Sequence, residues 1–188
     1  MRLIGLIVTG LWLSACTTLP MFPAAVMQDV ETNTFDVKAW VEQAYHPSDT
    51  MFVPHKVKLG GMILQVIRHP EDVVILVKEL PLKVAATSSS TSVKQDSRPW
   101  FAITFQGAVE PSMLQTGNRL IVVGTTNRAS AELFGGAPRM LPHLMAQCLH
   151  IWNDEGMMET YACIGDTSYA GRLPPHEGTF CLGPQNGS

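Results

Sequence analysis

Apolar side chains recur along the chain at the spacing of β-strands. Residues 57–67 and 73–80 are rich in Val, Ile and Leu, and the polar segment 69–72 between them contains a proline of fixed φ, which predicts a turn. Residues 100–105 alternate in the manner of a strand. In all we expect about six strands, at residues 57–67, 73–80, 100–105, 119–125, 144–152 and 157–164.

Glycines, prolines and one helical period interrupt these strands. Gly60 and Gly61 lie inside the first strand and predict a bulge or a sharp bend, such as a small barrel needs at a corner, or a close approach of neighbouring backbone. Residues 36–45 place apolar side chains on one face of a short helix that Asp36 can cap. Residues 111–116 predict a turn or one helical turn. Further breaks are expected at the polar loop 86–99 and at Gly135, Gly136 and Pro138.

Short strands joined by turns, with one or two short helices, favour an all-β fold with mainly antiparallel strands. Such chains form sandwiches or small barrels. We expect a small OB-like β-barrel of about six strands, in which the last hairpin turns at residues 154–157.

The N-terminus has the order of an export signal. Arg2 supplies a positive charge, and residues 3–13 form an apolar run that would span about 16 Å as a helix, roughly half of a hydrocarbon core. The run is therefore too short for a stable membrane span and has the length of a signal-peptide core. The small residues Ser14 and Ala15 then precede Cys16.

The segment from Leu13 to Cys16 resembles the lipobox of bacterial lipoproteins, in which a dedicated signal peptidase cuts before a cysteine that carries diacylglycerol. We expect residues 1–15 to be the signal peptide and Cys16 to be lipidated, which would anchor the chain at about 0.8 kcal/mol per buried CH₂. Lipoproteins that stay in the inner membrane typically carry an aspartate directly after the lipidated cysteine. This chain has Thr17 at that position, which favours the outer membrane. An uncleaved anchor and an ordinary signal peptide are the alternatives.

The mature chain divides into three parts on composition. Residues 16–33 contain the lipidated cysteine and, with Pro20, Pro23 and no clear period, predict a flexible tether. Residues 34–171 form the barrel domain. Residues 172–188 are rich in glycine and proline, which predicts a loosely ordered tail.

Charge and composition exclude several classes of protein. The chain has 188 residues, with 13 Lys and Arg against 16 Asp and Glu, a net charge of -3. Without a basic excess, a nucleic-acid binder that works by neutralising phosphates is not expected. Charged residues are 15% and hydrophobic residues 46%, so the chain is not disordered. With one apolar segment only, it is not a polytopic membrane protein.

The cysteines suggest a disulfide. Cys148 and Cys163 lie symmetrically about the predicted turn at 154–157, so they would face each other across a hairpin at nearly disulfide distance. In an oxidising periplasm the bond would form, and its 15-residue loop would contribute roughly 3 kcal/mol. A bond between Cys163 and Cys181, and free thiols, are the alternatives.

Catalytic chemistry is sparse. The sequence has no P-loop, no dinucleotide-binding glycine pattern, no zincin helix, no Gly-x-Ser-x-Gly elbow and no Cys-x-x-Cys pair. The six histidines are scattered, and for His150, near Cys148, a structural role is favoured over a metal site. We expect no enzyme activity, no metal and no cofactor apart from the covalent lipid on Cys16. A reactive Cys181 thiol is the enzymatic alternative.

Three aromatic residues share one predicted strand. Trp100, Phe101 and Phe105 would form a binding face for an oligosaccharide or a peptide if they pointed outward. The alternative, which we favour, is that they belong to the core.

Several blocks, in their order along the chain, resemble the Slp family of outer-membrane lipoproteins. The family pattern is a V-x-L-G-G opening, a closing P-L, a G-F-L-D-P turn, a G-x-x-x-T-V-x-G strand and a late H-L-W. The corresponding blocks here begin at Val57, Pro81, Gly107, Gly117 and His150.

The resemblance implies an outer-membrane-anchored, non-catalytic lipoprotein, linked to starvation or stress and to envelope integrity. It implies the outer membrane as the partner of the lipid anchor, with envelope proteins or glycans as further partners, and a domain that faces the periplasm. The alternative is a tethered periplasmic module that binds an oligosaccharide or a peptide. The resemblance supplies no catalytic residues.

Overall fold

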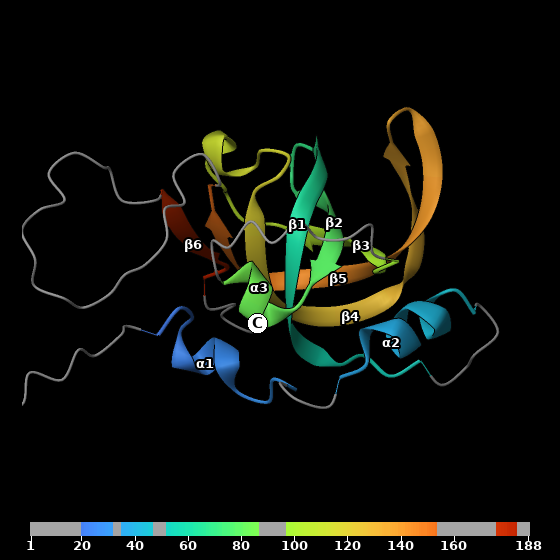
Figure 1. Ribbon diagram of the computed structural model, residues 1–188, viewed down its shortest axis with the longest axis horizontal. Coiled ribbons are helices and arrows are strands. Elements are labelled where there is room, and N and C mark those ends of the chain that lie inside the picture. The colour runs from blue at the N-terminus through green and yellow to red at the C-terminus, as the bar shows by residue number, and fades with distance from the viewer. Residues whose placement is uncertain (1–19, 32–34, 47–51, 87–96, 154–175, 184–188) are drawn as a thin grey trace, which may run out of the picture.

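The fold is a mainly antiparallel β-sheet with short helices (Figure 1), seen in a computed structural model that describes residues 20–31, 35–46, 52–86, 97–153 and 176–183. The all-β prediction is confirmed. Within the described residues the strands are β1 (Lys56–Arg68), β2 (Val73–Leu80), β3 (Trp100–Phe105), β4 (Arg119–Phe134), β5 (Ala137–Trp152) and β6 (Glu177–Cys181). The helices are α1 (Ala24–Met27), α2 (Val37–Ala44) and α3 (Leu82–Ala85), with a 3-10 turn η1 (Pro111–Met113).

Hydrogen bonds join five of the strands into a ring. The sheet order is β3-β2-β1-β4-β5-β6, and β3 also pairs in parallel with β5, at Ala102 with His143 through Thr104 with Met145. The ring therefore runs β1-β2-β3-β5-β4 and back to β1. β6 lies outside the ring, antiparallel to β5.

Gly60 and Gly61 bring β1 close to its neighbours, but the bulge expected there lies elsewhere. A Cβ on Gly60 would lie 2.7 Å from the carbonyl oxygen of Leu80 and 2.8 Å from the Cβ of Ala85, so only glycine fits. The register between β1 and β2 is regular at both glycines and shifts between Ile63 and Gln65. The prediction of a close backbone approach is correct, and the bulge prediction is wrong by a few residues.

β4 and β5 are longer than predicted and form a hairpin arm (Figure 1). The arm turns at Gly135 and Gly136, whose φ angles of 63° and 79° suit a tight two-residue hairpin turn. The sequence interpretation ended the strand at residue 125 because residues 127–132 are largely polar. Those residues continue the β4–β5 ladder, in which Glu132 is opposite Arg139.

Helix α2 lies where the sequence predicts a helix, at residues 36–45, and it covers the interior of the ring. The Asp36 carboxylate accepts hydrogen bonds from the backbone N–H groups of Lys38 and Ala39, at 2.9 and 3.1 Å, and caps the helix. Trp40 is buried, its ring packs edge-on against Phe101, and its indole N–H donates to the carbonyl of Asn127. The expected helix and its cap are confirmed.

Buried apolar side chains form an inner core and two outer clusters. The inner core fills the ring and contains alternate residues of the strands, among them Ile75, Val77, Phe101, Ile103, Leu120 and Val122. The anchor-side cluster lies on the outside of the ring and consists of Phe22, Leu80, Ala85, Ile121, Val123, Cys148 and Trp152. The hairpin cluster, on another outer face, consists of Val74, Leu76, Ala102, Phe134 and Leu141.

Residues 20–31 are packed on the strand ring, contrary to the predicted tether. Phe22 is 3% exposed in the anchor-side cluster, and the Glu31 backbone N–H donates to the carbonyl of Lys56 at 2.9 Å. The apolar side chains of this segment that pack on the cluster follow no single period, so the sequence pattern did not predict the contact.

The predicted loose tail is also partly wrong. Residues Glu177–Cys181 form β6, in register with β5 from Trp152 to Cys148. Pairing to an existing strand edge, together with a covalent bond to it, compensates for a sequence that contains glycine. The strand expected at 157–164 lies outside the described residues.

Candidate functional site

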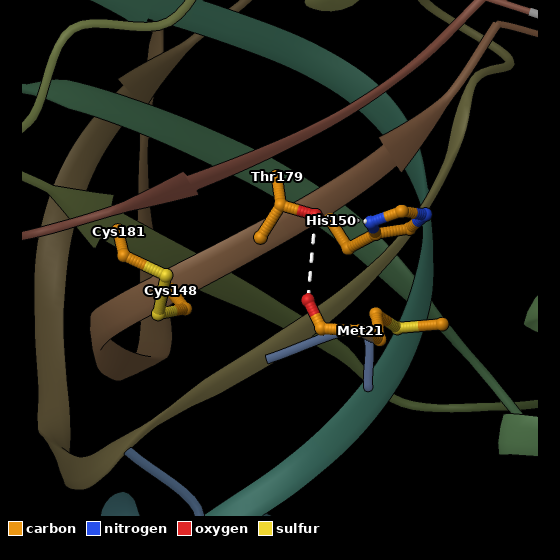
Figure 2. Close-up of a disulfide and its surroundings, with 5 residues drawn as sticks. All are labelled: Met21, Cys148, His150, Thr179 and Cys181. Atoms are coloured by element: carbon orange, nitrogen blue, oxygen red, sulfur yellow. Dashed lines mark hydrogen bonds between the residues drawn. A yellow bond between two sulfur atoms is a disulfide. The ribbon is translucent and has the colours of Figure 1, made fainter. Parts of the chain in front are cut away.

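A disulfide joins the last two strands of the sheet. Cys148 on β5 is bonded to Cys181 on β6, and their Cα atoms are 4.1 Å apart (Figure 2). The two residues are direct cross-strand partners, the arrangement in which Cβ atoms come near disulfide distance. The bond closes a chain separation of 33 residues.

The predicted partner of Cys148 was wrong. The sequence interpretation paired Cys148 with Cys163 through a hairpin turn at 154–157, and both that turn and Cys163 lie outside the described residues. In the structure β6 occupies the edge of β5 and places Cys181 opposite Cys148. The prediction of a cross-strand disulfide at Cys148 is correct, but the second strand is β6, within the predicted tail.

Next to the disulfide, one hydroxyl links three segments of the chain. Thr179 on β6 lies opposite His150 on β5, and its Oγ1 is 2.6 Å from the His150 Nδ1. The same hydroxyl donates to the backbone carbonyl of Met21 at 3.4 Å (Figure 2). We call Met21, Phe22, His150, Thr179 and the Cys148–Cys181 disulfide the N-terminal clasp, because they hold the start of the folded chain against β5 and β6.

Aromatic packing completes the clasp around Phe22. The Phe22 ring meets His150 edge-on, with ring centroids 6.4 Å apart, and His150 in turn packs edge-on on Trp152 at 4.3 Å. The ammonium of Lys58 lies 5.6 Å from the centre of the Phe22 ring, within cation–π range. Phe22 thus has the His150 ring edge-on to it and a cation over its ring.

Burial lowers the pKa of His150. Loss of hydration is the largest cause, the Glu177 carboxylate opposes it by charge and by a hydrogen bond, and Lys58 adds to the lowering. The His150 Nε2 lies 3.6 Å from a Glu177 oxygen. The ring is therefore held neutral in the folded protein more strongly than in an unfolded chain.

None of the clasp contacts was predicted from the sequence, although the two-residue spacing within each strand indicates which side chains share a face. Cys148 and His150 are two residues apart on one strand, and Thr179 and Cys181 are two apart on another, so each pair points to one face. Once Cys148 is opposite Cys181, His150 is necessarily opposite Thr179. No sequence pattern indicated that Phe22 would pack there.

A second site, the hairpin groove, lies under the β4–β5 arm. It is a cavity of about 260 Å³ lined by side chains of β1, β2, β3 and the arm. Trp100, which is 41% exposed, contributes its indole, and the Arg139 guanidinium lies 5.7 Å from the centre of that ring. The lining residues are Leu64, Gln65, Leu76, Trp100, Phe134, Gly135 and Arg139.

The predicted aromatic face is divided by the strand. Phe101 and Phe105 point into the ring and are essentially fully buried, whereas Trp100 points outward into the hairpin groove. Successive side chains of a strand alternate between its faces, so residues 100 and 101 cannot share one. The favoured core interpretation is right for the two phenylalanines, and the binding face of all three is wrong.

The predicted lipidation site, Cys16, lies outside the described residues.

A buried polar chain runs beneath the hairpin arm. The Thr104 Oγ1 is 3.3 Å from the His143 Nδ1, and the His143 Nε2 is 3.6 Å from a Glu132 oxygen. Burial lowers the pKa of His143, and the Glu132 charge partly opposes this. Thr104 and His143 are both buried, whereas the partly exposed Glu132 carboxylate lies just beyond hydrogen-bond distance and leaves the His143 Nε2 without a hydrogen-bond partner.

Within the described ranges, no helix has both the length and the apolar character to cross a bilayer. Among the same residues, His, Cys, Asp and Glu side chains form no group of three suited to hold a metal ion.

The model of the Outer membrane lipoprotein Slp family matches residues 13–176, most of the chain. The match begins at Leu13, so it includes the segment that resembles a lipobox as well as the strand ring and its hairpin arm. No curated protein matches the chain.

Proposed function

Because the chain belongs to the Slp family of outer membrane lipoproteins, we propose that it is acylated at Cys16 and acts at the outer membrane as a non-catalytic structural or interaction module linked to stress or starvation. The observation that carries this proposal is the extent of the family match, which starts at Leu13 and continues through Cys16 into the folded domain. The domain faces the periplasm in this proposal.

The disulfide supports an exported protein. Disulfides persist in oxidising compartments such as the periplasm and are rare in the cytosol. The Cys148–Cys181 bond uses two cysteines of the described chain. It also supports a non-catalytic role, because Cys181, the thiol that was the enzymatic alternative, is oxidised in it.

We infer further that the ring is a closed small barrel of the OB type. Support comes from the five-stranded order β1-β2-β3-β5-β4, with antiparallel neighbours and one parallel seam between β3 and β5. In solution, nuclear Overhauser contacts between Ile103 and Leu144 would support closure. A spectrum in which β2 contacts β3 but β3 lacks all contacts to β5 would contradict it.

The experiment that tests the main proposal is mass spectrometry of the N-terminal peptide from density-separated membranes. We expect an acylated peptide that starts at Cys16, in the outer-membrane fraction. In the Cys16→Ala variant the peptide should carry no lipid and leave that fraction. A soluble chain with another N-terminus, unaffected by the substitution, would contradict the proposal.

A second candidate function is ligand binding at the hairpin groove. The observation that favours it is Trp100, an exposed indole beside the Arg139 guanidinium at the edge of a mostly apolar cavity. Aromatic faces with a few polar groups are typical of sites for oligosaccharides and peptides. The candidate site contains Trp100 from the predicted aromatic face. Residues of the arm take the place of Phe101 and Phe105.

Titration with peptidoglycan fragments, followed by tryptophan fluorescence, tests this candidate. A saturable change that disappears in Trp100→Ala would support it. The matched control is Leu133→Ala, on the exposed outer side of the arm, which should bind as the parent does. A signal that persists in Trp100→Ala would place the ligand elsewhere.

A further inference from the structure

The described part of the chain begins very close in sequence to the proposed lipid. Phe22 is buried, the Met21 carbonyl accepts the Thr179 hydroxyl, and Glu31 bridges to β1, so the segment from Pro20 onward is held on the barrel. Four peptide steps separate Cys16 from Pro20. Even fully extended, such a piece of chain reaches only about 13–14 Å.

This reach is short compared with the domain. A compact domain of roughly 150 residues is about 35–40 Å across. A lipid on Cys16 can therefore leave only one side of the domain against the bilayer, the side that carries Pro20. The domain cannot turn its opposite side to the lipid while the N-terminal clasp is closed.

The surface near Pro20 has little charge. From Cys16 to Gln28 the chain has no charged residue. Pro20, Pro23, Ala24 and Ala25 are exposed there, whereas the apolar side chains of α1 behind them pack on the anchor-side cluster. Small apolar side chains without charges can enter the headgroup region at low desolvation cost.

Charged groups border this surface. Lys58 lies beside the Phe22 ring, and α3, which carries Lys83, packs on the same cluster. Lysines near a phospholipid surface are attracted to its phosphates. Asp29 and Glu31 follow α1, and the Glu31 carboxylate is 2.8 Å from the His55 ring.

We propose that Pro20, Pro23, Ala24 and Ala25, which we call the anchor face, lie on the phospholipid surface of the outer membrane, with the hairpin arm pointing away from it. This proposal rests on the proposed acylation of Cys16. Figure 1 shows α1 at the lower left of the ring and the β4–β5 arm at the upper right. The hairpin groove is then open to the periplasm while the lipid holds the opposite side.

Lipid-quenching of a site-specific fluorophore tests the orientation. The full acylated chain is reconstituted in vesicles of phosphatidylethanolamine and phosphatidylglycerol that contain a headgroup-labelled quencher lipid. The fluorophore is placed at Ala25→Cys, in a Cys163→Ser background so that the introduced thiol is labelled. The matched control is Ala137→Cys, an exposed alanine at the end of the arm. We expect several-fold stronger quenching at residue 25 than at residue 137.

Lengthening the connection provides the second measurement. A flexible Gly-Ser insert of roughly a dozen residues between Thr18 and Leu19 would add about 20 Å of reach. It should lower quenching at residue 25 toward the level at residue 137 while the protein still floats with the vesicles. Equal quenching at both positions in the parent, with flotation intact, would overturn the orientation alone. A parent chain that does not float would overturn the lipid anchor and this proposal together.

Discussion

The anchor-side cluster and the hairpin cluster are both apolar patches on the outside of one ring, but different kinds of chain cover them. The first is covered by the N-terminal segment and α3, beside a disulfide that fixes β6. The second is covered by the tip of the β4–β5 arm, through Phe134 and Leu141, and leaves a cavity in which Trp100 is exposed.

The difference lies in what stands behind each cover. The N-terminal segment lies against β5 and β6, which the Cys148–Cys181 bond joins covalently. The arm turns on two glycines and carries no cross-link among the described residues, and segments of that kind open at low free-energy cost. Changes to either cover test this contrast.

Removal of the disulfide should have the largest effect. In the Cys148→Ser/Cys181→Ser variant, loss of a 33-residue cross-link should lower the free energy of unfolding by roughly 3–4 kcal/mol in the chain-entropy model. Denaturant unfolding under non-reducing conditions measures it. Cys163→Ser is the control and should unfold as the parent does. An equal loss in both variants would indicate that Cys163 takes part in the native bond.

Truncation of the two buried phenylalanines compares the covers directly. Phe22→Ala should cost about 2–3 kcal/mol, the transfer free energy of one buried phenylalanine, because the segment can detach without further unfolding. Amide exchange distinguishes the two sites. Phe22→Ala should expose the Glu31 amide, which bonds to Lys56, whereas Phe134→Ala should speed exchange in the arm and leave Glu31 protected. The same exchange pattern in both variants would refute independent covers.

Acid should weaken both regions. Burial lowers the pKa of His150 and of His143, so the unfolded chain binds protons more readily than the folded one below the ordinary histidine pKa of about 6.5. The free energy of unfolding should therefore have its highest value well above the ordinary histidine pKa and decrease as the pH drops from about 7 to about 5. The His143→Gln/His150→Gln variant should show a smaller fall, and the exposed His46→Gln variant should keep it.

The smallest effect is expected at the hairpin groove. Arg139→Gln removes the cation beside Trp100, an exposed interaction of about 0.5–1 kcal/mol. The unfolding midpoint should change little, but the emission of Trp100, taken as the difference from a Trp100→Phe chain, should shift. Arg139→Lys should keep part of the parent emission. An emission unchanged in Arg139→Gln would mean that the guanidinium does not lie over the ring in solution.

Local chemistry allowed much of the ring to be predicted from the sequence. Asp36 caps its helix through its own neighbours, and β2 and β3 are mostly apolar runs with turns or polar residues at their ends, so their bounds follow from adjacent residues. The sequence predicts a close backbone approach at Gly60, and the structure leaves no room there for a side chain beside the Leu80 carbonyl.

The regions that escaped prediction depend on distant contacts. Phe22, Thr179 and Cys181 acquire their roles from β5, which lies far from Phe22 along the chain. The polar residues of the arm form a strand because each has a partner across a two-glycine turn, a condition that apolar periodicity does not report. The symmetric disulfide prediction failed for the same reason, since it assumed a hairpin turn at 154–157 that would place Cys163 opposite Cys148, whereas β6 places Cys181 there.

The position of the cystine has one more consequence, for proteolysis. Every peptide bond between Cys148 and Cys181 lies inside a covalent loop. A single cut by an envelope protease anywhere in that loop would divide the backbone and still leave the two pieces as one molecule, with β6 joined to β5. The nicked protein would run as a full-size chain on a non-reducing gel and as two fragments after reduction.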